Sequence, residues 1–178
     1  MQMDAVRAEL KFENCFTVGR NGLGGGLAML WSSDIAINIA SYSQHHIDAE
    51  ICNEEGQNWR CTRVYEHPKT TQKRHTWTLM KWLANLSPLL WLCFGDFNEI
   101  LHLHEKKGGN NRDVNMMFEF RDAIQECGLT DVGCKGRIFT WSNRRYRPNF
   151  IEERLDRFLC NSEWGNQFHD LASTNLES

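Results

Sequence analysis

An uninterrupted apolar run, residues 89–94 (LLWLCF), ends directly in the polar sequence Gly-Asp-Phe-Asn-Glu of residues 95–99. The run shows no alternation of apolar and polar residues, so it predicts a β-strand that is buried on both faces. Such a strand lies in the interior of a layered fold, because other elements must cover both faces of its sheet. The sequence therefore places residues 89–94 at the centre of the fold.

Helical periodicity flanks this run on both sides. Apolar side chains recur at helical spacing through residues 72–86, and Pro88 ends that pattern. A second helix is predicted at residues 114–127, between an expected N-cap at Asp113 and an expected stop at Gly128. Its apolar face consists of Met117, Phe120, Ile124 and Cys127.

Short apolar segments bounded by turn residues predict the remaining strands. The expected strands are residues 27–31, 35–40, 47–52, 59–65, 138–141 and 154–158, with a short helix at 3–11, a glycine turn at 22–26 and a polar hairpin at 143–153. Strands separated by lone helices predict sheets that are covered by helices on the outside.

The chain has 178 residues, enough for one domain with a sizeable core, which we take as residues 1–178. Its 41% hydrophobic and 24% charged residues are an ordinary globular balance. No apolar run approaches the roughly 20 residues that span a bilayer, and the charged N-terminus is unlike a signal peptide. We expect a soluble intracellular protein with no membrane partner, and the sequence leaves nucleus and cytoplasm open.

The net charge and the cysteine content argue against a DNA-binding surface and against a structural zinc site. The net charge is −3, whereas a sequence-independent DNA binder usually has a positive excess. Two short basic clusters occur and are more often solvated surface: Arg144, Arg145 and Arg147, and Lys69, Lys73 and Arg74. The seven cysteines form no CxxC pair, which predicts reduced thiols and no structural zinc site.

The polar sequence after the central strand carries the chemistry. Asp96 and Asn98 are two residues apart, so they project to one side while the chain stays extended, and Phe97 faces the core. A carboxylate can take a proton from water, and an amide can donate to a developing oxyanion on a phosphate. The alternative is an ordinary strand end, where Gly, Asp and Asn are favoured for turns.

Six segments, in this order, resemble the endonuclease domain of plant LINE-type (non-LTR) retrotransposons, from about residue 12 to the end. They are residues 25–31, Val64-Tyr65 with Pro68, and residues 91–99, 106–109, 139–143 and 153–157. That family lies in the endonuclease/exonuclease/phosphatase superfamily, with the apurinic endonucleases and DNase I. The resemblance implies an α/β (α+β) fold, a two-sheet β-sandwich flanked by helices, described as a DNase I-like four-layer sandwich.

The resemblance also implies a role for four catalytic residues. Asp96 matches the aspartate that activates the attacking water, and Asn98 matches the asparagine that contacts the phosphate. Tyr65 matches a tyrosine that supports the phosphate or the transition state. Asp156 matches the aspartate that holds and polarises a histidine.

Two of these four residues have simpler interpretations when the resemblance is set aside. Tyr65 is then a strand tyrosine with its hydroxyl at the surface, and Asp156 forms a hairpin salt bridge with Arg154 or Arg157. For substrate, the resemblance implies DNA, and it places Trp141 and Asn143 where the family approaches DNA.

The resemblance further implies Mg²⁺ as cofactor and a downstream reverse transcriptase in the same polyprotein. The family's metal-ligand glutamate and its Ser-Asp-His segment have no match in residues 1–178. We therefore assign no metal ligand, and expect a domain incomplete at both termini that binds Mg²⁺ weakly and has little activity on its own.

Three hypotheses follow for the function. The first is a Mg²⁺-dependent phosphodiesterase that nicks DNA. The second is a non-catalytic transposon remnant with at most residual nucleic-acid binding. The third is a phosphoesterase of the same fold that acts on another substrate, since a fold alone does not determine its substrate.

Overall fold

The computed structural model describes residues 3–19, 26–65, 70–146, 148–170 and 172–175. The elements are α1 (Met3–Glu9), β1 (Asn14–Val18), β2 (Leu27–Trp31), β3 (Ala36–Ser43), β4 (His46–Cys52), β5 (Asn58–Tyr65), α2 (Thr70–Ala84), β6 (Leu90–Asp96), η1 (Leu103–Glu105), β7 (Lys106–Lys107), α3 (Val114–Glu126), β8 (Leu129–Asp131), β9 (Cys134–Lys135), β10 (Trp141–Ser142), β11 (Glu152–Glu153), β12 (Asp156–Asn161), α4 (Ser162–Gln167) and β13 (Ser173–Thr174). Within these ranges, no helix combines the length and apolarity needed to cross a bilayer.

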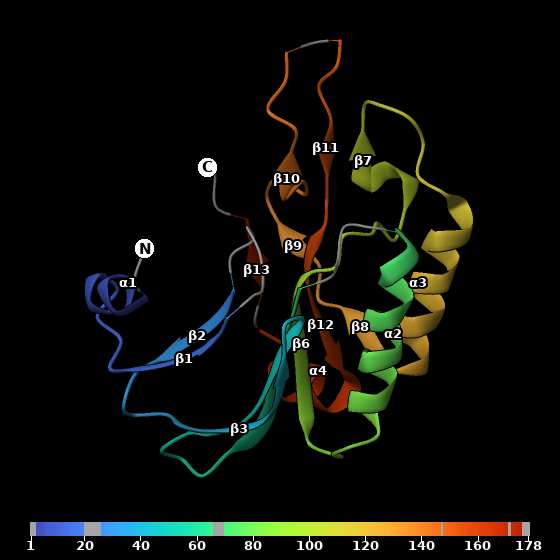
Figure 1. Cartoon of the computed structure of the whole chain (residues 1–178). Helices are drawn as coiled ribbons and strands as arrows, with labels where there is room; N and C mark the ends of the chain where they lie inside the picture. The colour runs from blue at the N-terminus through green and yellow to red at the C-terminus, as the bar shows by residue number, and fades with distance from the viewer. Residues whose placement is uncertain (1–2, 20–25, 66–69, 147, 171, 176–178) are drawn as a thin grey trace.

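A six-stranded sheet forms the centre of the molecule, in the order β3-β4-β5-β6-β12-β8 (Figure 1). The pair β5–β6 is parallel and the other neighbours are antiparallel. The predicted central strand is β6, which has neighbours on both sides, so its expected interior position is confirmed.

Helices α2 and α3 cover one face of this sheet (Figure 1). Both predicted helices are present, and the expected N-cap is confirmed because the Asp113 side chain accepts from the Asn115 N–H. Gly128 follows α3 with a φ of 65°, a left-handed conformation that glycine adopts without strain. The rings of Trp77 in α2 and Phe120 in α3 stack with centroids 5.8 Å apart, within the main core cluster.

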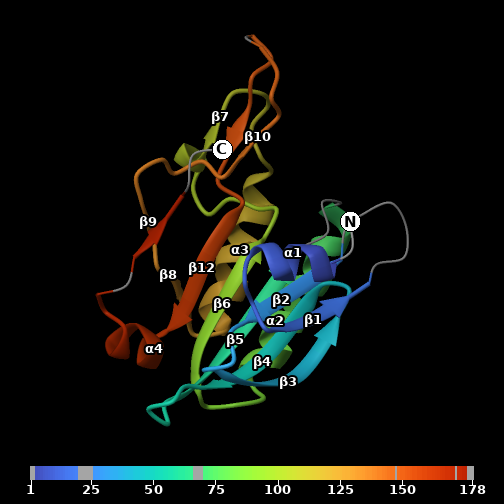
Figure 2. The same ribbon diagram turned by 90° about the vertical axis from the view of Figure 1, so that its left-hand side faces the viewer.

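The opposite face of the sheet is covered less completely. The ribbon β1–β2 lies over the β3–β4 side and the short pair β9–β13 lies at the far side, with β6 and β12 between them (Figure 2). Along β6, Trp91 and Cys93 are buried under the helices, but Leu92 and Phe94 are only half-buried. The prediction that this strand is buried on both faces is therefore wrong for the described residues, because only the helical face is fully covered.

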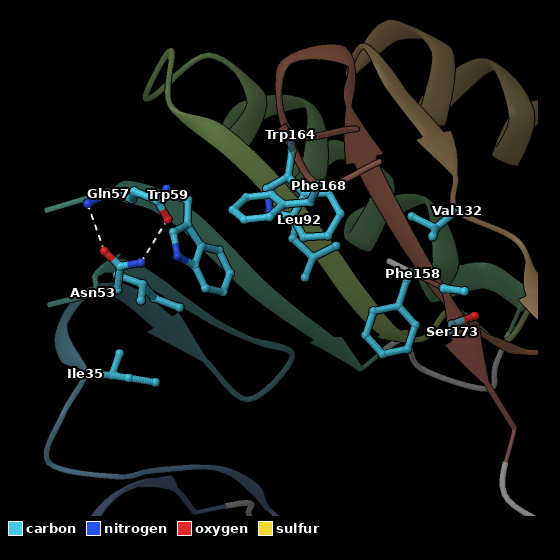
Figure 3. Close-up of a pocket in the computed structure, with 12 residues that line it drawn as sticks. Ile35, Asn53, Gln57, Trp59, Leu92, Val132, Phe158, Trp164, Phe168 and Ser173 are labelled. Atoms are coloured by element: carbon cyan, nitrogen blue, oxygen red, sulfur yellow. Dashed lines mark hydrogen bonds between the residues drawn. The ribbon is translucent and has the colours of Figure 1, made fainter. Parts of the chain in front are cut away.

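An apolar pocket of about 430 Å³ occupies the uncovered middle of that face (Figure 3). Its walls include Trp59 from β5, Leu92 from β6 and Phe158 from β12, with Trp164 and Phe168 of the α4 region at one end. Phe158 is 40% exposed and stacks on Phe94 with ring centroids 5.3 Å apart. The face is thus a contiguous apolar surface that reaches solvent.

The strand predictions need correction. Residues 14–18 form β1, which was not predicted, and it pairs with β2 along its whole length. The strand expected at 138–141 is only the two-residue β10, and β12 begins at Asp156 rather than at residue 154. Outside β9, β10 and β11, the described part of residues 134–155 runs in loops and turns, where the local sequence gives little periodic signal. The predicted glycine turn at 22–26 lies outside the described residues except for Gly26.

We expect the apolar face to cause self-association, because soluble monomers seldom expose large contiguous apolar patches. Phe158→Ser removes the most exposed aromatic ring of the face and should lower the weight-average sedimentation coefficient at high protein concentration. Trp82→Ser is the matched control, because Trp82 is 52% exposed on α2 and lies outside the pocket. Equal association of the wild type and the Phe158 variant would contradict this assignment.

Candidate active site

Three of the predicted catalytic residues lie in one row across three adjacent strands. Asp96 at the end of β6 is the register partner of Asp156 in β12 and of Tyr65 in β5. Partners in register point to the same face of a sheet, and neighbouring strands lie about 4.8 Å apart. Asp96 is in phase with Leu92 and so faces away from the helices. The structure therefore brings Asp96, Asp156 and Tyr65 together where β5 and β6 end.

Asn98 joins this row through a turn. Its backbone N–H donates to Asp96 Oδ1 at 2.9 Å, and its side-chain Nδ2 donates to Asp96 Oδ2 at 3.3 Å. The φ of Asn98 is 49°, in the left-handed region that asparagine tolerates better than most residues. The expectation of an extended chain through residue 98 is wrong. Phe97, as predicted, is fully buried in the core.

The close approach of β5 to β6 accounts for the glycine that precedes Asp96. A Cβ at this position would lie 1.9 Å from the backbone oxygen of Val64 on β5, and its φ is 141°. Only glycine lets β5 and β6 approach so closely without strain. Gly95 thereby sets the neighbouring Tyr65 and Asp96 side by side.

The environment of Asp96 favours its protonated form. Burial raises the pKa of Asp96 above its usual value, and the nearby Asp156 carboxylate raises it further. The Asn98 backbone N–H and the cations of Lys73 and Arg112 act in the opposite direction. A carboxylate with a raised pKa is a better proton acceptor near neutral pH, as a general base requires.

The salt bridge proposed as the simpler role of Asp156 does not form. Arg157 is paired with Glu105 and Asp131, and Arg154 makes contacts with the same two carboxylates. The hydrogen bonds from Arg157 hold the pKa of Glu105 at about 2, against the opposing effect of burial. Among the described residues, no ion pair connects the Asp156 carboxylate with an arginine or a histidine. Asp156 is exposed, and its backbone N–H donates to Thr140 Oγ1 at 3.0 Å.

The two residues expected to bind substrate lie on the hairpin β10–β11, which projects beyond the end of the sheet (Figure 1). Trp141 lies at the base of this hairpin, directly after Thr140, which contacts Asp156. The Trp141 side chain is 45% exposed. Asn143 has a structural role, since its side chain accepts from the Ile151 N–H and donates to the Asn149 carbonyl. Trp141 is therefore available to a ligand, whereas Asn143 fastens the hairpin.

Sequence reasoning missed two cations at the site. Lys73 was interpreted as solvated surface, but it is 2% exposed and its Nζ donates to the Asn98 carbonyl at 2.5 Å. Arg112 donates to the same carbonyl at 3.2 Å. A signal for Lys73 was present, because it falls four and seven residues before Trp77 and Met80 on the buried face of the helix.

A histidine was missed as well. The backbone N–H of Tyr65 donates to the His45 carbonyl at 2.8 Å, and His45 Nδ1 lies 3.2 Å from the Tyr65 carbonyl. A carbonyl oxygen only accepts, so the proton of this contact is on Nδ1. His45, in the turn between β3 and β4, therefore holds the backbone of Tyr65 through its carbonyl and its ring.

The described residues do not form a complete magnesium site. No three side chains from His, Cys, Asp and Glu gather within these ranges in a way that could hold a metal ion. Mg²⁺ requires near-octahedral oxygen ligands and gives up its water reluctantly. The pair Asp96 and Asp156 falls short of that set, so the residues present do not fit the expected cofactor.

No protein-family model matches the chain, and no curated protein matches it. Solved structures do match, and they define the class: the chain has the DNase I-like fold of endonucleases, exonucleases and phosphatases. The resemblance inferred from the sequence motifs is thereby confirmed at the level of fold.

The endonuclease domain of TRAS1, a telomere-specific non-LTR retrotransposon, superimposes with a TM-score of 0.65 at 14% identity, covering 90% of this chain and 78% of that one. A β-hairpin deletion mutant of β toxin from Staphylococcus aureus also gives a TM-score of 0.65 at 14% identity, over 99% and 74% of the two chains. D. rerio TDP2 complexed with a single-stranded DNA product gives 0.55 at 14% identity, over 90% and 66%.

Proposed function

We propose that residues 1–178 belong to a single, partial phosphodiesterase domain that acts on nucleic acid, with Asp96 as the general base. The observation that carries this proposal is the row of Asp156, Asp96 and Tyr65 at the ends of adjacent strands. Asn98 is hydrogen-bonded to the same Asp96 carboxylate. Two carboxylates, an amide and a phenol on one face form a set that can activate water beside a phosphate.

Each residue has a distinct part in this mechanism. Asp96 accepts a proton from the water that attacks phosphorus. As the new P–O bond forms, the bond from phosphorus to the leaving sugar oxygen breaks, and solvent protonates that oxygen. Asn98 donates from its amide to a non-bridging phosphate oxygen, and the Tyr65 hydroxyl donates to the same group as negative charge develops. Asp156 raises the pKa of Asp96 and so improves its basicity. None of these steps uses Mg²⁺, the cofactor that the motif resemblance implies.

Nucleic acid is the substrate that the surrounding surface favours. The hairpin beside the site exposes Trp141, Arg144 and Arg145, and Tyr146 is 94% exposed near its tip. Arginines bind phosphates and aromatic rings stack on bases, a combination typical of nucleic-acid surfaces. The motif resemblance to LINE-type elements supports DNA in particular, in a polyprotein with a reverse transcriptase.

Plasmid nicking tests the proposal against a phosphomonoester control. Purified protein is incubated, with divalent metal ions added, with supercoiled plasmid and separately with a sugar phosphate. We expect slow nicking of the plasmid that depends on Asp96, no release of phosphate from the sugar, and wild-type activity of Asp170→Asn, whose side chain is 94% exposed. Preferential hydrolysis of the sugar phosphate would instead favour a phosphatase of the same fold.

A second candidate, binding without catalysis, has its own support. The described residues lack a three-ligand metal group and an ion-pair partner for Asp156, whereas the hairpin still exposes Arg144 and Arg145 to a phosphate backbone. Fluorescence anisotropy with a labelled oligonucleotide separates the two candidates. Binding that is lost in Arg144→Ala/Arg145→Ala, together with no nicking at any enzyme concentration, would favour the binding protein.

A further inference from the structure

We propose that Lys73 and Arg112 are positioning residues that together clamp the backbone carbonyl of Asn98 and so hold Asp96 and Asn98 in their working arrangement. The proposal rests on the phosphodiesterase function for its kinetic consequence. The two cations come from different parts of the fold, since Lys73 lies in the first turn of α2 and Arg112 lies just before α3.

Burying the Lys73 ammonium group costs desolvation energy, so its burial is not explained by stability alone. Its Nζ donates to the Asn98 carbonyl at 2.5 Å and to Glu99 Oε2 at 2.8 Å, and the Lys73 and Glu99 side chains are 2% and 3% exposed. Apolar residues of similar volume often replace such a buried pair without loss of stability. The pair therefore calls for a role beyond packing, and its contact with the Asn98 carbonyl supplies one.

Arg112 connects the same carbonyl with the hairpin. One of its terminal nitrogens donates to the Asn98 carbonyl at 3.2 Å, while Nε and the other nitrogen donate to Glu153 at 3.0 and 2.6 Å. Glu153 lies in β11 directly opposite Trp141. Arg112 therefore links the turn that carries Asn98 to the base of the hairpin expected to meet DNA.

Contacts to the Asn98 carbonyl restrain the turn that carries Asn98. A non-glycine residue in the left-handed region is less favourable there than in the right-handed region, so tertiary contacts help to hold Asn98 at its φ of 49°. Holding the carbonyl limits rotation about the backbone bonds next to it. It therefore helps to keep the N–H and the amide of Asn98 aimed at Asp96. Both cations also act to lower the pKa of Asp96, against the effect of burial, and so favour the ionised base.

Two variants test the clamp from its two sides. Arg112→Gln removes one donor and leaves Glu153 paired with Lys106. Lys73→Met/Glu99→Gln removes the other donor without leaving a buried carboxylate unpaired. The matched control is Lys81→Met/Glu126→Gln, an exposed pair that includes Lys81 on the same helix. Thermal unfolding establishes that each variant is folded.

Two NMR readouts do not depend on activity. In both clamp variants, exchange of the Asn98 amide proton should accelerate by about tenfold or more, because the turn opens more easily. In Arg112→Gln, the ¹³C titration of the Asp96 carboxyl should move to higher pH, since a cation that stabilises the ionised form is lost. Arg112→Lys should restore part of that shift. The control should match the wild type in both measurements.

The kinetic readout follows the NMR result. We expect kcat/KM for oligonucleotide hydrolysis to fall on the order of 10–100-fold in the clamp variants and to stay unchanged in the control. Folded clamp variants with wild-type Asn98 exchange and wild-type Asp96 titration would overturn the proposal. If the NMR changes appear in a protein that hydrolyses nothing, the clamp is supported and the proposed phosphodiesterase function is contradicted.

Discussion

Asp96→Asn is expected to lower the rate of phosphodiester hydrolysis by about 10²–10⁴-fold, the usual contribution of a general base. The amide cannot accept a proton from water, but its oxygen can still accept the Asn98 N–H that Asp96 Oδ1 accepts at 2.9 Å. The fold should therefore survive while the chemistry is lost. Single-turnover rates at saturating enzyme measure the effect, and a variant within threefold of the wild type would rule out Asp96 as the base.

The pH dependence of wild-type activity is a second test of Asp96 as the general base. A base works in its ionised form, and burial and Asp156 raise the pKa of Asp96. Activity should therefore decline, as the pH falls, at a higher pH than for an ordinary aspartate. Asp156→Asn removes the like charge, lowers the pKa of Asp96 and moves this acid limb to lower pH. An acid limb that stays in place in Asp156→Asn would show that another group controls it.

The largest expected loss of stability comes from Asp48→Ala. Asp48 and Arg60 are 1% and 2% exposed, and their side chains form two parallel hydrogen bonds of 2.8 and 2.9 Å. Arg60 also donates to the Leu83 carbonyl of α2, so the pair ties the sheet to the helix. Removing Asp48 leaves a buried guanidinium without its counter-charge, which typically costs about 3–5 kcal/mol.

Urea unfolding measures this loss against an exposed pair. Glu119→Ala breaks the ion pair with Arg74, whose side chain is 65% exposed, and such pairs contribute about 0–1 kcal/mol. Both variants remove one carboxylate that holds an arginine through two hydrogen bonds, so burial is the main difference between them. If Asp48→Ala lowered the free energy of unfolding no more than Glu119→Ala does, the buried pair would not be an important source of stability.

The sequence by itself determined the elements whose signal is local and periodic. Helices α2 and α3, the N-cap at Asp113 and the strands β2, β4, β5 and β6 follow from apolar spacing and from turn residues, which act within a few neighbours. The order of motifs also led to the DNase I-like fold and to the four residues that the structure places together.

Only the tertiary structure decided what depends on partners far away in the chain. The register that aligns Asp156 with Asp96 joins residues of two distant strands, and no local pattern encodes it. Helical spacing puts Lys73 on the buried face of α2, but only the tertiary structure supplies its partners, the Asn98 carbonyl and the Glu99 carboxylate. The half-exposed side of β6 also depends on distant parts of the chain. An apolar run indicates which side chains favour burial, but it does not indicate which elements will cover them.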